Sequence, residues 1–202
     1  MRTLLAAALV ALALPTAAAA GPVLALRLGW AASAGDAARE TPMSEVADGE
    51  IPIQLDAFWR FPPHWFGGVY YAYGFGRPSG AISDRCDALG ADCSVWTMRV
   101  GAQLGYTFGE LWRLAPWLAV GIGYEWTHED ASRGGLSGSQ TLSGWEFVNV
   151  EGGADVKVSG KVSVGPYASF RLGQYSRLDG YGIPSKGVHQ WYGVGIRARY
   201  DF

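Results

Sequence analysis

Residues Gln190–Phe202, QWYGVGIRARYDF, decide the fold, because apolar and polar residues alternate along them one by one. One set of alternate positions holds Tyr192, Val194, Ile196, Ala198, Tyr200 and Phe202. The opposite set holds Trp191, Gly193, Gly195, Arg197, Arg199 and Asp201. Successive side chains of a β-strand point to opposite faces, so this period of two predicts a strand with one apolar face. The run exceeds the ~9–11 residues that a tilted strand needs to cross a bilayer.

Seven further segments show the same period with varying clarity. They are residues 22–33, 50–60, 66–77, 95–108, 116–127, 146–158 and 162–175. In the clearest of them, Val100 and Leu104 share one face while Arg99 and Gln103 share the other. In the segment 66–77, aromatic residues occupy both sets of positions, which leaves its inward face open. Together with the final strand, these segments predict an all-β fold, an eight-stranded antiparallel up-and-down barrel.

The connections between the expected strands alternate in length. Three are short, at residues 61–65, 109–115 and 159–161. Four are longer and polar, at residues 34–49, 78–94, 128–145 and 176–189. Short turns on one rim and long loops on the other are typical of outer-membrane barrels, whose short turns face the periplasm.

The first twenty residues form a separate segment. Arg2 supplies a positive charge, residues 4–14 form an apolar run, and residues 15–20 end in small side chains. This pattern is typical of a secretory signal peptide that is cleaved after Ala20. We therefore expect residues 1–20 to be a signal peptide and residues 21–202 to be the barrel domain.

Overall composition excludes few classes of function. The one class that it argues against is binding to a strongly charged partner such as nucleic acid. Charged residues make up 17% of the chain and the formal net charge is −2, so we expect no nucleic-acid partner. Beyond residue 20, no stretch offers the ~20 consecutive apolar residues of a membrane-spanning helix. An exported chain of this kind belongs to the periplasm, the medium or the outer membrane.

Alternation by itself does not say which face of the barrel points inward. A soluble barrel of the lipocalin kind would bury its apolar face around a ligand and expose its charges to water. The interior of eight strands is narrow, however, and the polar positions are the glycine-rich ones, whereas the apolar positions carry large rings. Aromatic residues also gather at both ends of the apolar stripe, as they do at lipid–water boundaries. The sequence therefore predicts a transmembrane barrel, with the lipocalin-like barrel as the alternative.

The final strand also carries a family resemblance. Its apolar positions resemble the C-terminal signal that the outer-membrane barrel assembly machinery recognises, namely Tyr192, Val194, Ile196, Tyr200 and Phe202. With its eight strands and signal peptide, the chain resembles the small OmpA/OmpX-like outer-membrane β-barrel superfamily over nearly all of residues 22–202. The resemblance implies a Gram-negative outer-membrane location, without a cofactor. The implied partners are membrane lipid, lipopolysaccharide and the assembly machinery.

Charged residues occupy the polar positions of the strands. The basic ones are Arg27, Arg60, Arg99, Lys157, Arg171, Arg197 and Arg199, and the acidic ones are Asp56, Glu125, Glu151, Asp155 and Asp201. Unpaired charges in a narrow lumen are costly, so we expect these side chains to pair. The tight turn at 159–161 sets a register that places Asn149 opposite Arg171, with Glu151 diagonal to Arg171. We expect a salt-bridge core that plugs the lumen, with a conducting pathway as the alternative.

Two cysteines lie in the second long connection. Six residues separate Cys86 from Cys93, and an even pair in an exported protein predicts a disulfide. Closing a loop of this length contributes roughly 2.5 kcal/mol in the chain-entropy model. We expect the bridge to stiffen an extracellular loop whose ligand the sequence does not identify.

Catalysis finds little support in the sequence. The three histidines are His64, His128 and His189. His128 precedes Glu129, Asp130 and Ser132, but we place this set in a polar loop, where such clusters are usually solvated. Barrel lipid A deacylases are the enzymatic alternative, and the sequence contains no matching His-x-Ser arrangement. We expect no catalytic, cofactor or metal site.

The interpretation that follows is a non-enzymatic outer-membrane barrel with a structural or surface-interaction role. Its long loops would be presented to the cell exterior. A narrow pore or transport barrel is the second interpretation, and a lipid-modifying enzyme is the third. Because one barrel architecture serves all of these roles, the fold alone does not choose among them.

Overall fold

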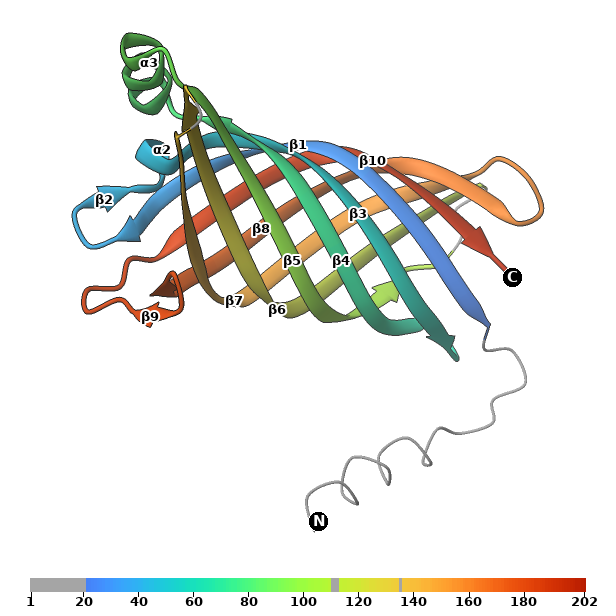
Figure 1. Cartoon of the computed structure of the whole chain (residues 1–202). Coiled ribbons are helices and arrows are strands. Elements are labelled where there is room, and N and C mark those ends of the chain that lie inside the picture. Colours follow the sequence, from blue (N-terminus) through green and yellow to red (C-terminus); the bar gives the residue numbers. More distant parts are fainter. Residues whose placement is uncertain (1–20, 110–112, 135) are drawn as a thin grey trace, which may run out of the picture.

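Eight long antiparallel strands close into a barrel in the computed structural model, which describes residues 21–109, 113–134 and 136–202 (Figure 1). The expected signal peptide lies outside these residues. The strands are β1 (Pro22–Ala38), β3 (Ala47–Phe61), β4 (Trp65–Pro78), β5 (Asp92–Thr107), β6 (Leu114–Arg133), β7 (Leu136–Lys157), β8 (Val162–Leu178) and β10 (His189–Asp201). Each pairs with the next along the chain, and β10 pairs with both β8 and β1. The predicted eight-stranded up-and-down barrel is confirmed.

The two ends of the barrel differ in the elements that they carry. Short connections lie at one end, hereafter the turn rim, beside the C-terminus (Figure 1). The opposite end, the loop rim, carries β2 (Thr41–Pro42), α2 (Met43–Val46), α3 (Gly80–Leu89) and β9 (Tyr181–Gly182). Both helices are short, and within the described ranges none is long and apolar enough to cross a membrane.

The prediction of a loop at residues 128–145 is wrong. Strand β6 continues to Arg133 and β7 begins at Leu136, so the two form an extended hairpin in which these residues pair. Near the tip the side chains are exposed on both faces, and no alternation of apolar residues marks the strands there. The loops expected at 34–49 and 176–189 are also shorter than predicted, because β1 runs to Ala38 and β8 to Leu178.

The apolar positions of the barrel strands point outward. Val100, Ile122 and Ile196 are 45%, 58% and 53% exposed, while Arg99 and Arg197 on the alternate positions are buried. This is the reverse of a soluble barrel, and it overturns the lipocalin-like alternative, which needs the apolar face inside.

The inward face of β4, which the sequence left open, is now defined. Tyr70 and Ala72 are buried in the lumen, whereas Val69, Tyr71 and Phe75 are exposed on the outer surface.

Strand β7 breaks the simple alternation in the middle of the barrel wall. A register shift between Glu146 and Val148 in β7 leaves both Phe147 and Val148 facing outward. Such a bulge adds one residue to a strand and reverses the facing of everything beyond it. Glu146, which strict alternation from Val148 assigns to the apolar face, is therefore buried in the lumen.

Glycines on the inward face make room for lumen aromatics. A Cβ atom at Gly105 would overlap the ring of Phe66, its partner across the β4–β5 ladder. A Cβ at Gly29 would approach the hydroxyl of Tyr167 to 2.8 Å. The abundance of glycine on the polar positions therefore has a steric cause: large inward rings need neighbours without side chains.

We predict that Gly105→Ala destabilises the barrel by about 1–3 kcal/mol, because it overpacks the lumen against Phe66. In a Phe66→Ala background the same substitution should cost much less, since the clashing ring is gone. Gly138→Ala, at a site with open space around its Cβ, is the matched control and should be close to neutral. Equilibrium unfolding in lipid vesicles measures all four variants. Equal effects of Gly105→Ala in both backgrounds would contradict this steric account.

Candidate functional site

The lumen holds a network of buried ion pairs, and its centre is organised by two arginines. Arg99 of β5 contacts Glu125 at 2.8 Å and Glu50 at 2.5 Å. Arg27 of β1 contacts Asp56 at 2.7 Å and also pairs with Glu151. All of these side chains are almost completely shielded from solvent. Each arginine thus binds carboxylates from two different strands and ties them together across the lumen.

Neutral and charged donors extend the network around Arg27, and Glu146 links it to the other centre, lying 3.9 Å from Arg171 and 4.0 Å from Arg99. The register expected for β7 and β8 is present, with Asn149 opposite Arg171. Arg171 donates to Glu151 at 3.2 Å and to Gln54 at 2.8 Å. Gln54 in turn donates to Asp56 at 2.8 Å. The result is one continuous polar network that contacts β1, β3, β7 and β8.

Toward the turn rim the network ends in a cation held by aromatic rings. The Arg197 guanidinium lies 4.2 Å from the Trp117 ring centroid and 5.3 Å from that of Phe58. Arg199, nearer the rim, contacts Asp155 at 3.0 Å and Asp201 at 3.1 Å. Arginine stacks well on aromatic faces because its planar charge is delocalised and weakly hydrated.

Two basic residues expected in the lumen lie at its edge instead. Arg60 is 45% exposed and is 3.5 Å from Asp201, and Lys157 is exposed. Both occupy inward positions at strand ends, where the barrel opens to solvent. Alternation gave the correct direction of these side chains but not their depth.

The sequence missed two carboxylates of the central network, Glu50 and Glu146. Glu50 occupies a polar position at the start of the expected strand 50–60, so the period of two contained a signal for it. Glu146 had no such signal, because the bulge in β7 reverses its facing. The hydroxyl of Tyr70 donates to Glu146, which also lies 3.9 Å from Arg171.

Toward the loop rim the network meets a buried histidine. The ring of His189 stacks on Tyr175 with centroids 4.1 Å apart, and its Nε2 lies 3.5 Å from Glu125. Glu125 also accepts a hydrogen bond from the Tyr175 hydroxyl at 2.5 Å. Above this layer, Met43 and Val46 of α2 join an apolar cluster with Trp191. The short helix therefore covers the lumen from the loop side.

The remaining histidines lie in β6 and in the turn after β3. His128 lies in strand β6 rather than in a loop, which corrects the expectation for residues 128–132. Its Nδ1 is 2.6 Å from the Thr141 hydroxyl, and its Nε2 is 3.2 Å from Asp130. His64 lies in the turn after β3, its ring edge-on to Tyr106.

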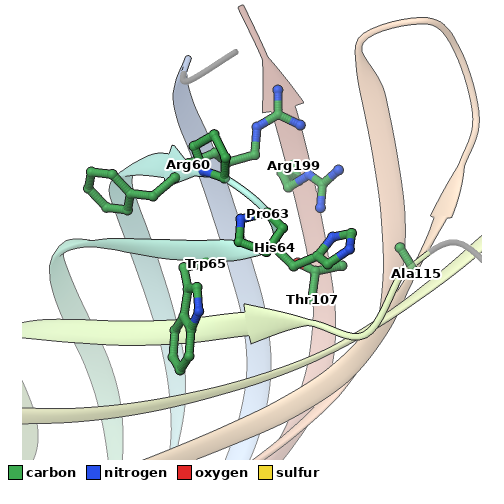
Figure 2. Close-up of a pocket in the computed structure, with 10 residues that line it drawn as sticks. Arg60, Pro63, His64, Trp65, Thr107, Ala115 and Arg199 are labelled. Carbon is green, nitrogen blue, oxygen red and sulfur yellow. The ribbon is translucent and has the colours of Figure 1, made fainter. Parts of the chain in front are cut away.

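His64 lines a pocket of about 380 Å³ at the turn rim (Figure 2). Figure 2 shows Arg60 and Arg199 beside this histidine, with Trp65, Thr107 and Ala115 around it. Both arginines already contact carboxylates of the rim. The pocket is the turn-side mouth of the charged lumen.

The disulfide joins the helix of the second loop to the barrel. Cys86 in α3 is bonded to Cys93 in β5. Helix α3 begins after Ser79, whose hydroxyl accepts a hydrogen bond from the Ile82 amide, and ends at Gly90 in the left-handed conformation. The sequence predicted a bridge here but not the helix that it anchors.

Comparison with solved structures agrees with this geometry. The Neisserial surface protein NspA superposes with a TM-score of 0.57 at 15% sequence identity, covering 91% of this chain and 99% of that chain. A major outer membrane protein from Thermus thermophilus superposes with a TM-score of 0.56 at 10% identity, covering 91% and 100%. The present chain has the fold of the small outer-membrane β-barrels.

The same comparison includes a protein studied in lipid. The outer membrane protein AlkL, solved in DMPC bilayers, superposes with a TM-score of 0.54 at 15% identity and covers 94% of this chain and 95% of that chain. No family model matches the sequence, and no curated protein matches it significantly. At these identities the likeness to OmpA/OmpX-like barrels is one of fold.

We predict that Arg99→Met destabilises this outer-membrane-type barrel by about 3–5 kcal/mol, because it leaves Glu50 and Glu125 buried without their cation. Arg60→Met, which removes a partly exposed arginine from the rim, should cost only about 0–1 kcal/mol. Equilibrium unfolding in vesicles at constant ionic strength gives both values. A loss at Arg99 no larger than that at Arg60 would show that the lumen charges are not energetically coupled.

Proposed function

We propose that this protein is a non-enzymatic outer-membrane barrel that presents structured elements at the cell surface and keeps its lumen closed. One observation carries the proposal: the barrel is inverted, with charges buried inside and apolar side chains outside. Exposed apolar patches of more than a few hundred Å² are rare on soluble monomers and mark contact with lipid or protein. Here the apolar surface surrounds the barrel, as contact with a bilayer requires.

Aromatic side chains border this apolar band at both ends. Toward the loop rim are Trp30, Phe75, Trp96, Trp126, Trp145 and Tyr192. Toward the turn rim are Trp59, Trp65, Tyr106, Phe108, Tyr200 and Phe202. Amphipathic rings favour the two membrane–water boundaries, so these girdles support a membrane position for the strands between them.

The different lengths of the connections at the two rims support an orientation in the membrane. In outer-membrane barrels the short turns face the periplasm and the longer connections face outward. We therefore infer that α2, α3 and the β6–β7 hairpin lie outside the cell, next to lipopolysaccharide. We also infer that the C-terminal strand, including Val194, Ile196 and Phe202, engages the barrel assembly machinery during insertion.

The continuous ion-pair network supports a closed lumen. Arg27 and Arg171 each contact two carboxylates and Arg99 contacts three, and the apolar cluster around Met43 covers them from the loop side. Opening a path for solute requires these paired, buried groups to separate, at a cost of several kcal/mol.

A narrow pore is the second candidate, and one observation favours it. Several lumen polar atoms have no hydrogen-bond partner among the described residues, including both side-chain polar atoms of Asn149 and two nitrogens of Arg197. Buried polar groups of this kind commonly bind internal water. A continuous row of such waters through the lumen would give a path for ions or small solutes.

Planar-bilayer recording separates the two candidates. We expect the wild-type protein to give no discrete conductance steps, because the network and the apolar cluster both obstruct the lumen. The double variant Met43→Ala/Arg99→Ala tests whether the recording detects an opened lumen. Steps from the wild-type protein would replace the closed barrel with the pore.

The membrane position of the strands predicts a depth profile. Arginine at Val100, Ile122 or Ile196 should cost about 2–4 kcal/mol, because these positions lie near the middle of the apolar band. Arginine at Tyr200, close to the turn rim, should cost only about 0–1 kcal/mol. Reversible unfolding in vesicles measures each variant. A flat profile, or a folded protein soluble without detergent, would contradict the membrane barrel.

The proposed orientation predicts which positions are accessible on whole cells. Cysteines placed at Asp36, Asp92, Ser137 or Asp179, all exposed at the loop rim, should react with an impermeant thiol reagent. Gly160→Cys at the turn rim should react only after the outer membrane is permeabilised. Labelling of intact cells at Gly160 alone would invert the orientation.

A further inference from the structure

A cavity of about 570 Å³ lies at the loop rim, outside the lumen network. Its floor is the extended part of the sheet, where Val95 of β5 pairs with Glu129 of β6, and Glu129 pairs with Gln140 of β7. Helices α2 and α3 form the opposite wall. The lining residues are Thr41, Glu45, Val46, Ile82, Cys86, Leu89, Cys93, Ser94, Val95, Glu129, Asp130, Ala131, Gly138, Ser139 and Gln140.

Both helical walls are fixed in place. The Cys86–Cys93 disulfide joins α3 to β5. The Ser79 hydroxyl donates to the Glu45 carbonyl of α2 at 3.0 Å and accepts from the Ile82 amide of α3 at 3.2 Å. A cavity whose walls are already cross-linked loses little conformational entropy when a ligand binds.

The lining combines apolar surface with negative charge. Val46, Ile82, Leu89 and Val95 supply the apolar side chains. Of the lining residues that the structure describes, three are carboxylates and none is Lys, Arg or His. Asp130 is already in contact with His128 at 3.2 Å.

Among the lining carboxylates, Glu129 has an oxygen that lacks a hydrogen-bond donor among the described residues. Its Oε1 is shielded from solvent and has no hydrogen-bond partner in the described part of the chain. Burial raises the pKa of this carboxyl, and the nearby His128 only partly opposes that rise. A buried acceptor without a donor is costly, and a cationic donor entering the cavity would relieve that cost.

We propose that this cavity binds a small organic cation with an apolar body, such as an alkyl- or arylammonium compound. The ammonium group sits at Glu129, and the apolar body packs against Ile82, Leu89 and Val95. A divalent metal fits less well, because no group of three His, Cys, Asp or Glu side chains in the described ranges is placed to hold one. The ligand class therefore follows from one half-buried carboxylate, with a shielded Oε1, beside apolar walls.

The proposal relies on the proposed function only for the side of the membrane from which the ligand arrives. Binding itself is measured on purified, folded protein in a non-ionic detergent, which carries no ammonium group to compete for the cavity and in which orientation has no influence. A failure to bind would therefore leave the membrane barrel untouched, and a failed depth profile would leave the cavity untouched.

The experiment titrates benzylammonium, whose N–H groups can donate to a carboxylate, into the folded protein by isothermal calorimetry at neutral pH, with benzyl alcohol as the uncharged probe. We expect saturable binding of the cation and at least about tenfold weaker binding of the alcohol, the ratio that loss of one charge-assisted contact gives. Glu129→Gln should weaken cation binding by a similar factor. Asp48→Asn, an exposed carboxylate at the same rim that does not line the cavity, should leave it unchanged.

A steric variant tests the location without changing charge. Ala131→Trp fills the cavity from β6 and should abolish binding, while circular dichroism and resistance to unfolding in detergent report that the barrel remains folded. Absence of saturable binding would overturn the proposal. So would equal affinity in wild type and Glu129→Gln, or binding that survives in a folded Ala131→Trp protein.

Discussion

The structure depends on the closure of its backbone hydrogen bonds into a ring. β10 pairs with β8 on one side and with β1 on the other, so each of the eight long strands has a neighbour along both edges. In hydrocarbon an unpaired amide or carbonyl costs several kcal/mol, and a closed barrel is the only way for strands to avoid that cost. Once the ring is closed, each strand residue has only two environments available, the outer surface or the lumen.

A ring of eight strands encloses little space, and this narrowness shapes the lumen. Large inward side chains such as Phe66 and Tyr167 are accommodated because glycines face them. The charged residues that share this space lie close enough for Arg27, Arg99 and Arg171 each to contact more than one carboxylate. Ion pairs of this kind are weak evidence for stability, since desolvation offsets much of their attraction. Their clearer effect is that a displaced or missing partner leaves a buried charge unpaired, which strongly destabilises the fold. The network therefore favours one arrangement of the interior side chains.

The loop rim differs from the rest of the barrel in its outward side chains, which are polar there. Beyond Trp126, the outward positions of β6 become His128, Asp130 and Ser132, so the hairpin leaves the apolar band while its ladder continues. Helices α2 and α3 fold over this end, one covering the lumen and the other held by the disulfide. The result is a rigid outer face with a cavity of its own, separate from the charged interior.

Local alternation was sufficient to predict the strands and which side chains share a face, because a period of two has one geometrical meaning. The inversion of the barrel needed further signals in the sequence, namely glycine on the polar positions and large rings on the apolar ones. The cysteine spacing likewise predicted the bridge between Cys86 and Cys93. Alternation did not predict Glu146, whose facing depends on a bulge, or the hairpin near Arg133, whose two faces are both polar. The partners of Arg99 and Arg27, and the cavity around Glu129, come from strands far apart in the chain. Tertiary structure alone decided these, because contacts across a lumen depend on how the strands are staggered when the ring closes, and no local pattern encodes that stagger.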